Sequence, residues 1–327
     1  MKAIAVGEFG GPEVLKLVKL GTPSCGEDEV LIRVEAVSVN YADILARMGK
    51  YHAAGKPPFI PGLDAAGTIE VVGREVKNFK VGQRVIAFPK SGSYAEYVVA
   101  NEKLTFVLPE QVDFDTGAAC PIVSFTAYKL IADIARLQPG ETILIHAAAG
   151  GVGTTAVQLA RILGAATIIG TVGNEKKCAT ASDAGADHVI SHEDDFQNAV
   201  LKLTNGLGVD VILDSISGTV GEKSLKCLAM YGRLVVFGHA SGSFAQFKTT
   251  DLHSSCRAVL GFSSGTTRDN RPELLRDTAD RVLSFLAEGR LNMKIGGQFS
   301  LEEAPKAHRW VESRQSTGKV LLKVRSG

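Results

Sequence analysis

The sequence of 327 residues contains few cysteines and lacks any disulfide or cysteine-rich metal framework. Its five cysteines are scattered, their odd number cannot pair completely within the chain, and no Cys-x-x-Cys occurs. This usage excludes a disulfide-stapled secreted scaffold and predicts a reduced, cytoplasmic protein. The seven histidines show no paired ligand spacing either, so the residues predict no metal site.

An excess of one charge and long apolar runs are also lacking. Lys and Arg number 36 against 35 Asp and Glu, so no strong field attracts nucleic acid or an anionic membrane. The N-terminus has no apolar stretch of the signal-peptide kind. The most apolar region, residues 142–170, contains His146, Gln158 and Arg161, which favours a buried strand–turn–helix over a membrane span. We therefore expect neither nucleic acid nor membrane as a main partner.

The length predicts two domains, and the first 120 residues have the pattern of a β domain. Short segments rich in Val, Ile and aromatic residues alternate there with Gly and Pro turn signals. We expect an irregular, partly barrel-like arrangement. The predicted strands are Lys2–Val6, Val30–Val39, Gly67–Val72, Arg84–Phe88 and Tyr94–Ala100, with a helix over Asn40–Lys50.

The pattern changes near Pro121, where an amphipathic helix is predicted over Val123–Leu137. Beyond it, apolar strands alternate with helices, which predicts a parallel, doubly wound sheet. The expected strands are Thr142–His146, Thr167–Thr171, Asp187–Ile190, Val209–Asp214, Arg233–Phe237 and Ala258–Phe262. The expected helices between them are Gly153–Leu163, Lys176–Ala184, Phe196–Thr204 and Gly221–Leu228. A helix over Pro272–Glu288 and a strand over Lys319–Val324 follow.

One strand runs into the glycine-rich turn Gly150-Gly151-Val152-Gly153, which opens a helix. Gly150 lets the backbone approach a pyrophosphate, Gly153 allows close packing of helix on strand, and the helix N-terminus offers N–H groups. Ala148 replaces the first glycine of the usual G-x-G-x-x-G. The alternative is a tight turn without a ligand, but the strands and helix around it favour a dinucleotide site.

The end of the next strand bears on the choice of cofactor. A site for NAD usually has Asp or Glu there to bind the ribose hydroxyls, but this strand end carries none. Lys176 and Lys177 follow, and a lysine can neutralise the 2′-phosphate of NADPH. Two alternatives remain: these lysines form a solvated helix face, or Glu175 binds the ribose of NAD.

Four segments in order, residues 40–43, 58–67, 92–97 and 147–153, resemble the quinone oxidoreductase/ζ-crystallin branch of the medium-chain dehydrogenase/reductases. The resemblance implies a GroES-like domain over residues 1–122, completed by 266–327, and a Rossmann NADPH-binding domain over 123–265. The active site would lie in the cleft between them. It also implies a homodimer joined at the Rossmann sheet edge. Residues 256–262 suit that edge, although a buried internal strand has the same pattern.

The resemblance further implies site residues, with packing or surface roles as the alternative for each side chain. Lys177 and Arg314 correspond to cations beside the 2′-phosphate, and His192 stands where close relatives often have tyrosine. Other cofactor contacts implied are Thr126 near the nicotinamide, the turns at Ser215 and Phe237-Gly238, and Asn40. Asn40 and Tyr51 are the candidate catalytic hydrogen-bond donors of the nicotinamide and substrate pocket. For Tyr51, packing on the Pro57-Pro58 turn is the alternative.

The zinc ligands of related alcohol dehydrogenases are missing from this chain. The matching places hold Asn40, a poor zinc ligand, and Leu63-Asp64, where leucine is no ligand. Without a Lewis acid nothing stabilises an alkoxide, so acceptors such as quinones or activated alkenes are favoured over alcohols. The leading hypothesis is NADPH-dependent quinone reduction. The alternatives are an NADPH-dependent enone or enal reductase and an NADPH-binding protein with a structural or RNA-binding role.

Overall fold

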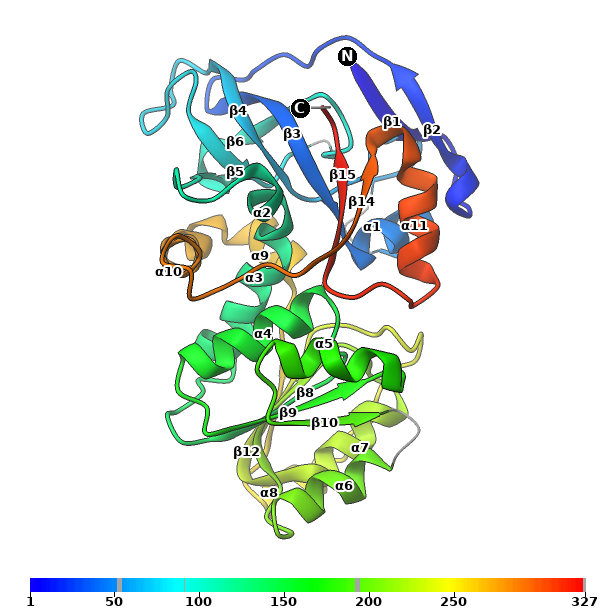
Figure 1. Cartoon of the computed structure of the whole chain (residues 1–327), viewed down its shortest axis with the longest axis vertical. Coiled ribbons are helices and arrows are strands. Elements are labelled where there is room, and N and C mark those ends of the chain that lie inside the picture. The colour runs from blue at the N-terminus through cyan, green and yellow to red at the C-terminus, as the bar shows by residue number, and fades with distance from the viewer. Residues whose placement is uncertain (52–54, 91, 192–194, 326–327) are drawn as a thin grey trace. The chain divides into compact units, whose positions relative to one another are not determined.

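The computed structural model describes residues 1–51, 55–90, 92–191 and 195–325. The chain forms two compact units, one of Met1–Phe125 with Ser264–Gly327 and one of Thr126–Ser263 (Figure 1). Helix α3, Pro121–Tyr128, crosses the boundary between them. Within the described residues, no helix is long and apolar enough to span a membrane.

The first unit is built on a mixed sheet with the order β14-β15-β3-β4-β5-β7, in which β6 also pairs with β3. Strand β3, Glu29–Val39, is the centre of this sheet because it pairs with β15, β4 and β6. The other strands of this sheet are β4 Ala65–Val72, β5 Arg84–Ala87, β6 Tyr97–Asn101, β7 Thr105–Val107, β14 Ile295–Ser300 and β15 Lys319–Lys323. Strands β1 Lys2–Val6 and β2 Leu15–Lys19 pair with each other in a separate two-stranded sheet. The helices are α1 Tyr41–Arg47, α2 Phe114–Ala119, α9 Ser264–Asn270, α10 Arg276–Ala287 and α11 Ala304–Glu312.

The apolar core of this unit includes residues far apart in the sequence. Val34 and Val37 of β3 pack with Leu322 of β15 and with Ala304 and Ala307 of α11. The final segments of the chain therefore complete the domain that the first residues begin. This arrangement brings Lys319 to Asn40, the residue directly after β3, and His308 to Tyr94.

The second unit contains a parallel sheet with the order β10-β9-β8-β11-β12-β13. The strands are β8 Thr142–Ile145, β9 Thr167–Val172, β10 His188–Ser191, β11 Val209–Asp214, β12 Leu228–Val236 and β13 Ala258–Gly261. The helices are α4 Gly151–Ile162, α5 Cys178–Asp183, α6 Phe196–Leu203, α7 Thr219–Cys227 and α8 Thr250–His253. Figure 1 shows α4 and α5 on one face and α6 and α7 on the other. Because both faces are covered, the central strands are almost wholly apolar.

The strand order of this sheet reverses between β8 and β11, which are direct neighbours. In open α/β sheets, ligands bind beyond the carboxyl ends of the strands at such a reversal. The predicted doubly wound parallel sheet is therefore confirmed, and the glycine-rich turn that follows β8 lies at its switch point.

Several details differ from the sequence predictions. The helix expected over Val123–Leu137 begins at Pro121 and winds as a π-helix over Lys129–Ile134, and most of its residues are buried, so it is not amphipathic. The strand expected from Tyr94 begins at Tyr97, because Ala95 instead forms an isolated bridge with β1. The sequence patterns predicted no element within residues 290–318, where the structure has β14 and α11.

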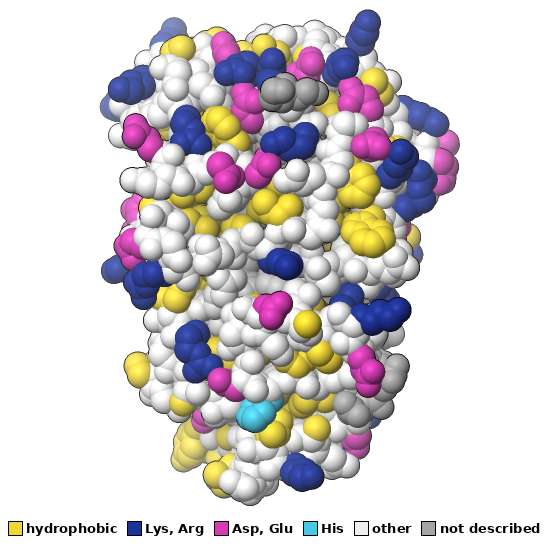
Figure 2. Space-filling model, viewed as in Figure 1, with side chains coloured by type: hydrophobic (Ala, Val, Ile, Leu, Met, Phe, Trp, Pro, Cys, Tyr) yellow, Lys and Arg dark blue, Asp and Glu magenta, His cyan; other side chains and the backbone are white. Residues whose placement is uncertain are grey.

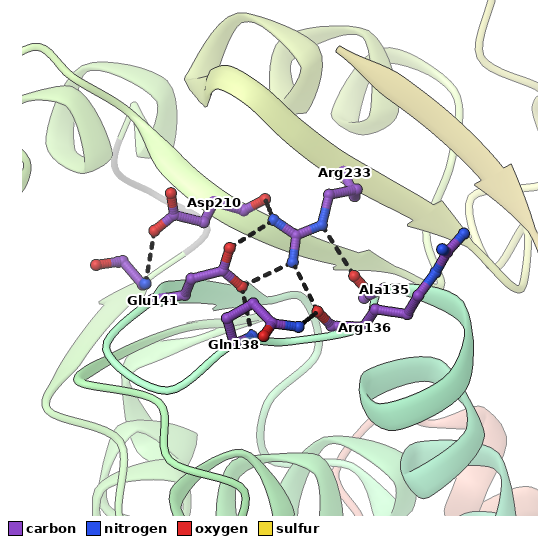
Figure 3. Close-up of polar contacts among 7 residues, drawn as sticks. Ala135, Arg136, Gln138, Glu141, Asp210 and Arg233 are labelled. Carbon is purple, nitrogen blue, oxygen red and sulfur yellow. Dashed lines mark hydrogen bonds and ion pairs between the residues drawn. The ribbon is translucent and has the colours of Figure 1, made fainter. Parts of the chain in front are cut away.

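Arg233 of β12 connects the last strands of the second unit to the turn before β8 (Figure 3). Its guanidinium forms two hydrogen bonds of 2.7 Å to the Glu141 carboxylate. It also donates to the carbonyl oxygens of Ala135, Arg136 and Asp210. This bidentate pair fixes the amino-terminal edge of the sheet, opposite the glycine turn.

Candidate active site

The turn between β8 and α4 has the geometry of a dinucleotide cradle. A Cβ atom at Gly153 would lie 2.2 Å from the Ala147 carbonyl oxygen, so only glycine permits this approach. Gly150 is the N-cap of α4 and supplies no side-chain cap. The N–H groups of the first turn, from Gly151 and Val152 onward, are therefore available to an anion, which the helix dipole also favours.

The structure brings several predicted cofactor residues to the same edge of the sheet. Ser215 follows β11, and Phe237 and Gly238 follow β12. A Cβ atom at Gly238 would lie 2.9 Å from the Ser215 carbonyl oxygen, so these two turns are in contact. The His146 amide donates to the Leu213 carbonyl oxygen at 3.1 Å, which joins the β8 turn to the end of β11. The β8, β11 and β12 turns thus form one continuous edge.

Sequence reasoning missed Asn174, which lies just beyond β9. Its side-chain Oδ1 is buried and has no hydrogen-bond partner among the described residues. A buried acceptor without a partner is costly, and ribose hydroxyls at this strand end would satisfy it. A lone asparagine in a turn carries no such signal in the sequence, because only the fold reveals that its oxygen is buried.

Lys177, Thr126 and Arg314 lie outside the three turns that follow β8, β11 and β12. Lys177, half-buried, is the N-cap residue of α5, close after the end of β9. Thr126 is buried within α3. Arg314 belongs to the first unit, is exposed and has a φ of 56° just after α11. His192 lies outside the described residues.

His146 is buried at the end of β8, as a packed, hydrogen-bonded residue. Ser224 Oγ donates to the Val220 carbonyl oxygen, so His146 Nε2 is the donor in its 2.7 Å bond to Ser224. His146 Nδ1 then accepts from the Thr171 hydroxyl at 2.8 Å. Burial lowers the pKa of His146 to about 4.

In the first unit, Asn40 lies at the centre of a buried polar cluster. Its amide nitrogen donates to Asp64 Oδ1 at 3.1 Å and to Ser38 Oγ at 3.4 Å. Its Oδ1 accepts from the Lys319 ammonium at 2.7 Å. Ser38 Oγ also donates to Asp64 Oδ1 at 2.7 Å. Every polar atom of the Asn40 side chain is therefore hydrogen-bonded within the protein.

A second group of polar side chains adjoins this cluster through Asp43. Asp43 forms a capping box with Asn40 at the start of α1, and its Oδ2 also accepts from the Tyr94 hydroxyl at 3.3 Å. Tyr94 contacts His308 Nε2 at 3.1 Å, and Arg47 contacts His308 Nδ1 at 3.3 Å. Because a guanidinium can only donate, Nδ1 accepts and Nε2 carries the hydrogen. Burial raises the pKa of Asp43 to about 7.

Tyr51 is half-buried, and its hydroxyl is hydrogen-bonded to Arg268. Burial raises the pKa of this hydroxyl, and the Arg268 cation opposes the rise. Arg268 is itself buried, with its guanidinium 5.2 Å from the centre of the Phe88 ring. Sequence reasoning missed Arg268, since nothing in residues 264–270 distinguishes it from a surface arginine on a short helix.

The residues at the places of the related zinc ligands do not fit zinc. Both oxygens of Asp64 already accept hydrogen bonds, from Ser38, Asn40 and the Ile122 amide. Its neighbours are an amide and an ammonium, which do not complete a tetrahedral set of nitrogen and sulfur ligands. Among the residues that the structure describes, no group of three or more His, Cys, Asp or Glu could hold a metal.

Comparison with known proteins identifies the family. The alcohol dehydrogenase GroES-like domain matches residues 26–110, and the zinc-binding dehydrogenase domain matches residues 151–280. The quinone oxidoreductase of Pseudomonas aeruginosa is 38% identical over 330 residues, covering 98% of this chain and 99% of its own length. The synaptic vesicle membrane protein VAT-1 homolog of Danio rerio is 32% identical over 339 residues, covering 98% of this chain and 69% of its own.

A solved structure supports the same assignment. The Escherichia coli quinone oxidoreductase in complex with NADPH superposes with a TM-score of 0.92 at 32% identity, covering 99% of this chain and all of that one. These matches define a dehydrogenase built from a GroES-like domain and a Rossmann domain. Within that class, the chain belongs to the quinone oxidoreductase branch of the medium-chain dehydrogenase/reductases. The predicted family and fold class are confirmed.

The close approach of the Ala147 carbonyl oxygen to Gly153 leads to a prediction about cofactor binding. We expect Gly153→Ala to weaken NADPH binding by about 100-fold or more, because the added methyl must push α4 away from the Ala147 carbonyl oxygen. Nicotinamide fluorescence titration measures the affinity, and circular dichroism checks that the variant is folded. Gly7→Ala is the matched control, since a Cβ there meets nothing within 4 Å. A folded Gly153→Ala protein with unchanged affinity would contradict the assignment.

The buried histidines make the fold sensitive to acid. Burial lowers the pKa of His308 to about 3, so the unfolded chain binds its proton more readily than the folded one. The resulting stability is complete above the ordinary pKa of 6.5 and declines as the pH falls towards 3. We expect His308→Gln to flatten the acid decline in the urea-derived free energy of unfolding. The exposed His253→Gln control should keep the wild-type slope, and an identical slope for His308→Gln would refute the linkage.

Proposed function

We propose that the protein is an NADPH-dependent quinone oxidoreductase that works without zinc. The observation that carries the proposal is the glycine turn at the β8/β11 switch point, followed by a β9 end without an acidic ribose ligand. Membership of the quinone oxidoreductase branch supports the choice of acceptor. The Asp64 environment, which does not fit zinc, supports a metal-free reduction.

The second unit would hold the cofactor. The first turn of α4, at Gly151 and Val152, would bind the pyrophosphate, and Asn174 Oδ1 would accept from the ribose. Lys177 would pair with the 2′-phosphate, with Arg314 as a second cation. When bound, NADPH supplies a hydride from its nicotinamide ring. The protein then has to orient the cofactor, exclude water and donate hydrogen bonds to the reduced acceptor.

The acceptor would be reduced beside Tyr51 and Asn40. A quinone that receives a hydride develops negative charge on a carbonyl oxygen, which a positioned hydroxyl stabilises. Arg268 favours this role, because a cation beside a phenol makes the phenol a stronger donor. Asn40 has its side chain committed to Lys319, Asp64 and Ser38, so we assign it to the wall of the pocket rather than to direct donation.

We further propose a cytoplasmic homodimer with no nucleic-acid partner. Strand β13 ends the strand order of the described sheet, and its residues are largely half-exposed, which suits edge-to-edge pairing of two copies. On the face drawn in Figure 2, positive and negative side chains are interspersed rather than gathered by sign. Interspersed charges disfavour a phosphate backbone as ligand.

Oxidation of NADPH with several acceptors tests the function. Purified protein is offered 1,4-benzoquinone, 9,10-phenanthrenequinone and an enone in parallel, with NADH as the control cofactor. We expect quinone turnover with NADPH strongly preferred. We expect Lys177→Met to raise KM for NADPH about 10-fold and leave KM for NADH unchanged. Turnover of the enone alone would reassign the enzyme as an alkene reductase, equal use of NADH would refute 2′-phosphate recognition, and NADPH binding without turnover would favour a non-enzymatic role.

A further inference from the structure

Lys319 is an unusual lysine, because its ammonium is enclosed in the first unit. The residue begins β15 and is only 3% exposed. Its Nζ donates to Asn40 Oδ1 at 2.7 Å and to the Val39 carbonyl oxygen at 3.1 Å. A buried ammonium is costly unless it is paired and hydrogen-bonded. A lysine exposed on a terminal strand would carry no such cost, so the burial of Lys319 needs an explanation.

We infer that Lys319 is a positioning residue of the acceptor site, which fixes the orientation of the Asn40 amide and balances the charge of Asp43 and Asp64. The inference rests on the proposed function, because that proposal is what assigns Asn40 to the wall of the acceptor pocket. Lys319 acts through Asn40 and the two carboxylates, and it does not touch the acceptor itself.

The orientation of the Asn40 amide follows from the chemistry of its donors and acceptors. An ammonium can only donate, so the Asn40 atom 2.7 Å from Lys319 Nζ must be the amide oxygen. The amide nitrogen is then directed at Asp64 Oδ1 and Ser38 Oγ. Lys319 fixes the oxygen edge of the Asn40 amide, and the Asp64 carboxylate, which can only accept, fixes the nitrogen edge. Without the ammonium, the oxygen edge loses its charged donor, and a proton taken up by Asp64 would also remove the preference at the nitrogen edge.

Three ionisable groups of this cluster are almost completely buried. Asp43 lies on α1, Asp64 just before β4, and Lys319 on β15. Burial raises the pKa of both carboxyl groups, and the positive charge of Lys319 opposes both rises. Burial lowers the pKa of Lys319, and both carboxylates oppose that fall. One ammonium thus balances two carboxylates, and its removal would drive at least one of them to bind a proton.

The other charged and titratable groups around the cluster do not replace Lys319. Arg47 of α1 is paired with Glu312 of α11, at 2.6 Å. His308, also on α11, has its pKa lowered by burial and is neutral at working pH. Burial and the neighbouring carboxylates hold the pKa of Tyr94 well above its usual value, so it is neutral too. Lys319 is the cation on which both carboxylates depend most directly among these groups.

Two further groups lie near the cluster. Burial raises the pKa of Cys120, near Asp64, to about 12, so its thiol is neutral. Arg268 donates to the Leu63 carbonyl oxygen and is hydrogen-bonded to Tyr51, and in the described part of the chain it forms no hydrogen bond to either carboxylate.

The test compares four full-length variants with the wild type: Lys319→Met, Lys319→Arg, the double variant Lys319→Met with Asp64→Asn, and Lys323→Met. Lys323 is the matched control, since it is on the same strand but partly exposed and paired with Asp115. The double variant removes one charge of each sign, so it remains informative if Lys319→Met does not fold. The measurements are kcat, KM for 1,4-benzoquinone and NADPH, and the pH profile of kcat.

We expect Lys319→Met to lower kcat about 10-fold or more while KM for NADPH changes less than about twofold. The acid limb of its kcat–pH profile should move up by about one pH unit, because Asp43 and Asp64 lose their cation. Lys319→Arg should recover most of kcat. The double variant should recover the pH profile but not kcat, since Asn40 remains unanchored. Lys323→Met should behave as the wild type.

Two outcomes would overturn the inference. One is a folded Lys319→Met protein with wild-type kcat and pH profile. The other is equal damage in Lys319→Met and Lys319→Arg to kcat, NADPH affinity and thermal stability, which indicates a merely structural residue. If the wild type reduces no quinone, the proposed function fails separately. The nuclear magnetic resonance signals of the Asn40 side-chain amide then decide: we expect one sharp, protected pair in the wild type that broadens in Lys319→Met, and no difference would refute the anchoring.

Discussion

The contact between Gly153 and the Ala147 carbonyl oxygen is the constraint on which the cofactor half of the molecule depends. It lets α4 begin directly against the end of β8, so the first turn of the helix lies at the point where the strand order reverses. The parallel register of β8 with β11 then brings the Ser215 turn alongside, and β12 adds Gly238. One residue without a side chain thereby allows three separate loops to meet at one edge of the sheet, where the proposed cofactor site lies.

In the first unit, the decisive feature is the hydrogen bonding of Asp64. The protein's family is related to zinc dehydrogenases, yet the matching position here is occupied by internal hydrogen bonds. Asp64 accepts hydrogen bonds from Ser38, Asn40 and a backbone amide, and the Lys319 ammonium acts on it as a nearby positive charge. Under the proposed function, this charge orients Asn40 without touching the acceptor, which suits acceptors that need no Lewis acid.

Local sequence patterns predicted the parallel sheet and the glycine turn, because both depend on the strand–turn–helix pattern of individual βα units. They did not predict the burial of Lys319 and Arg268, or of the Oδ1 atom of Asn174. A lysine at the start of a short strand resembles a surface residue, and only the approach of Asp64 and Asn40, encoded some 250 residues earlier, explains it. The same holds for α11, whose short segment is ordered by packing on β14 and β15.

The central claim is that NADPH-dependent quinone reduction proceeds here without a metal. The most direct measurement is the quinone-reducing rate of protein treated with a strong zinc chelator and then freed of it, with the residual metal quantified by mass spectrometry. We expect an unchanged kcat at far less than one zinc per chain, and no stimulation by added zinc. Loss of activity on chelation, with recovery on adding stoichiometric zinc, would contradict it.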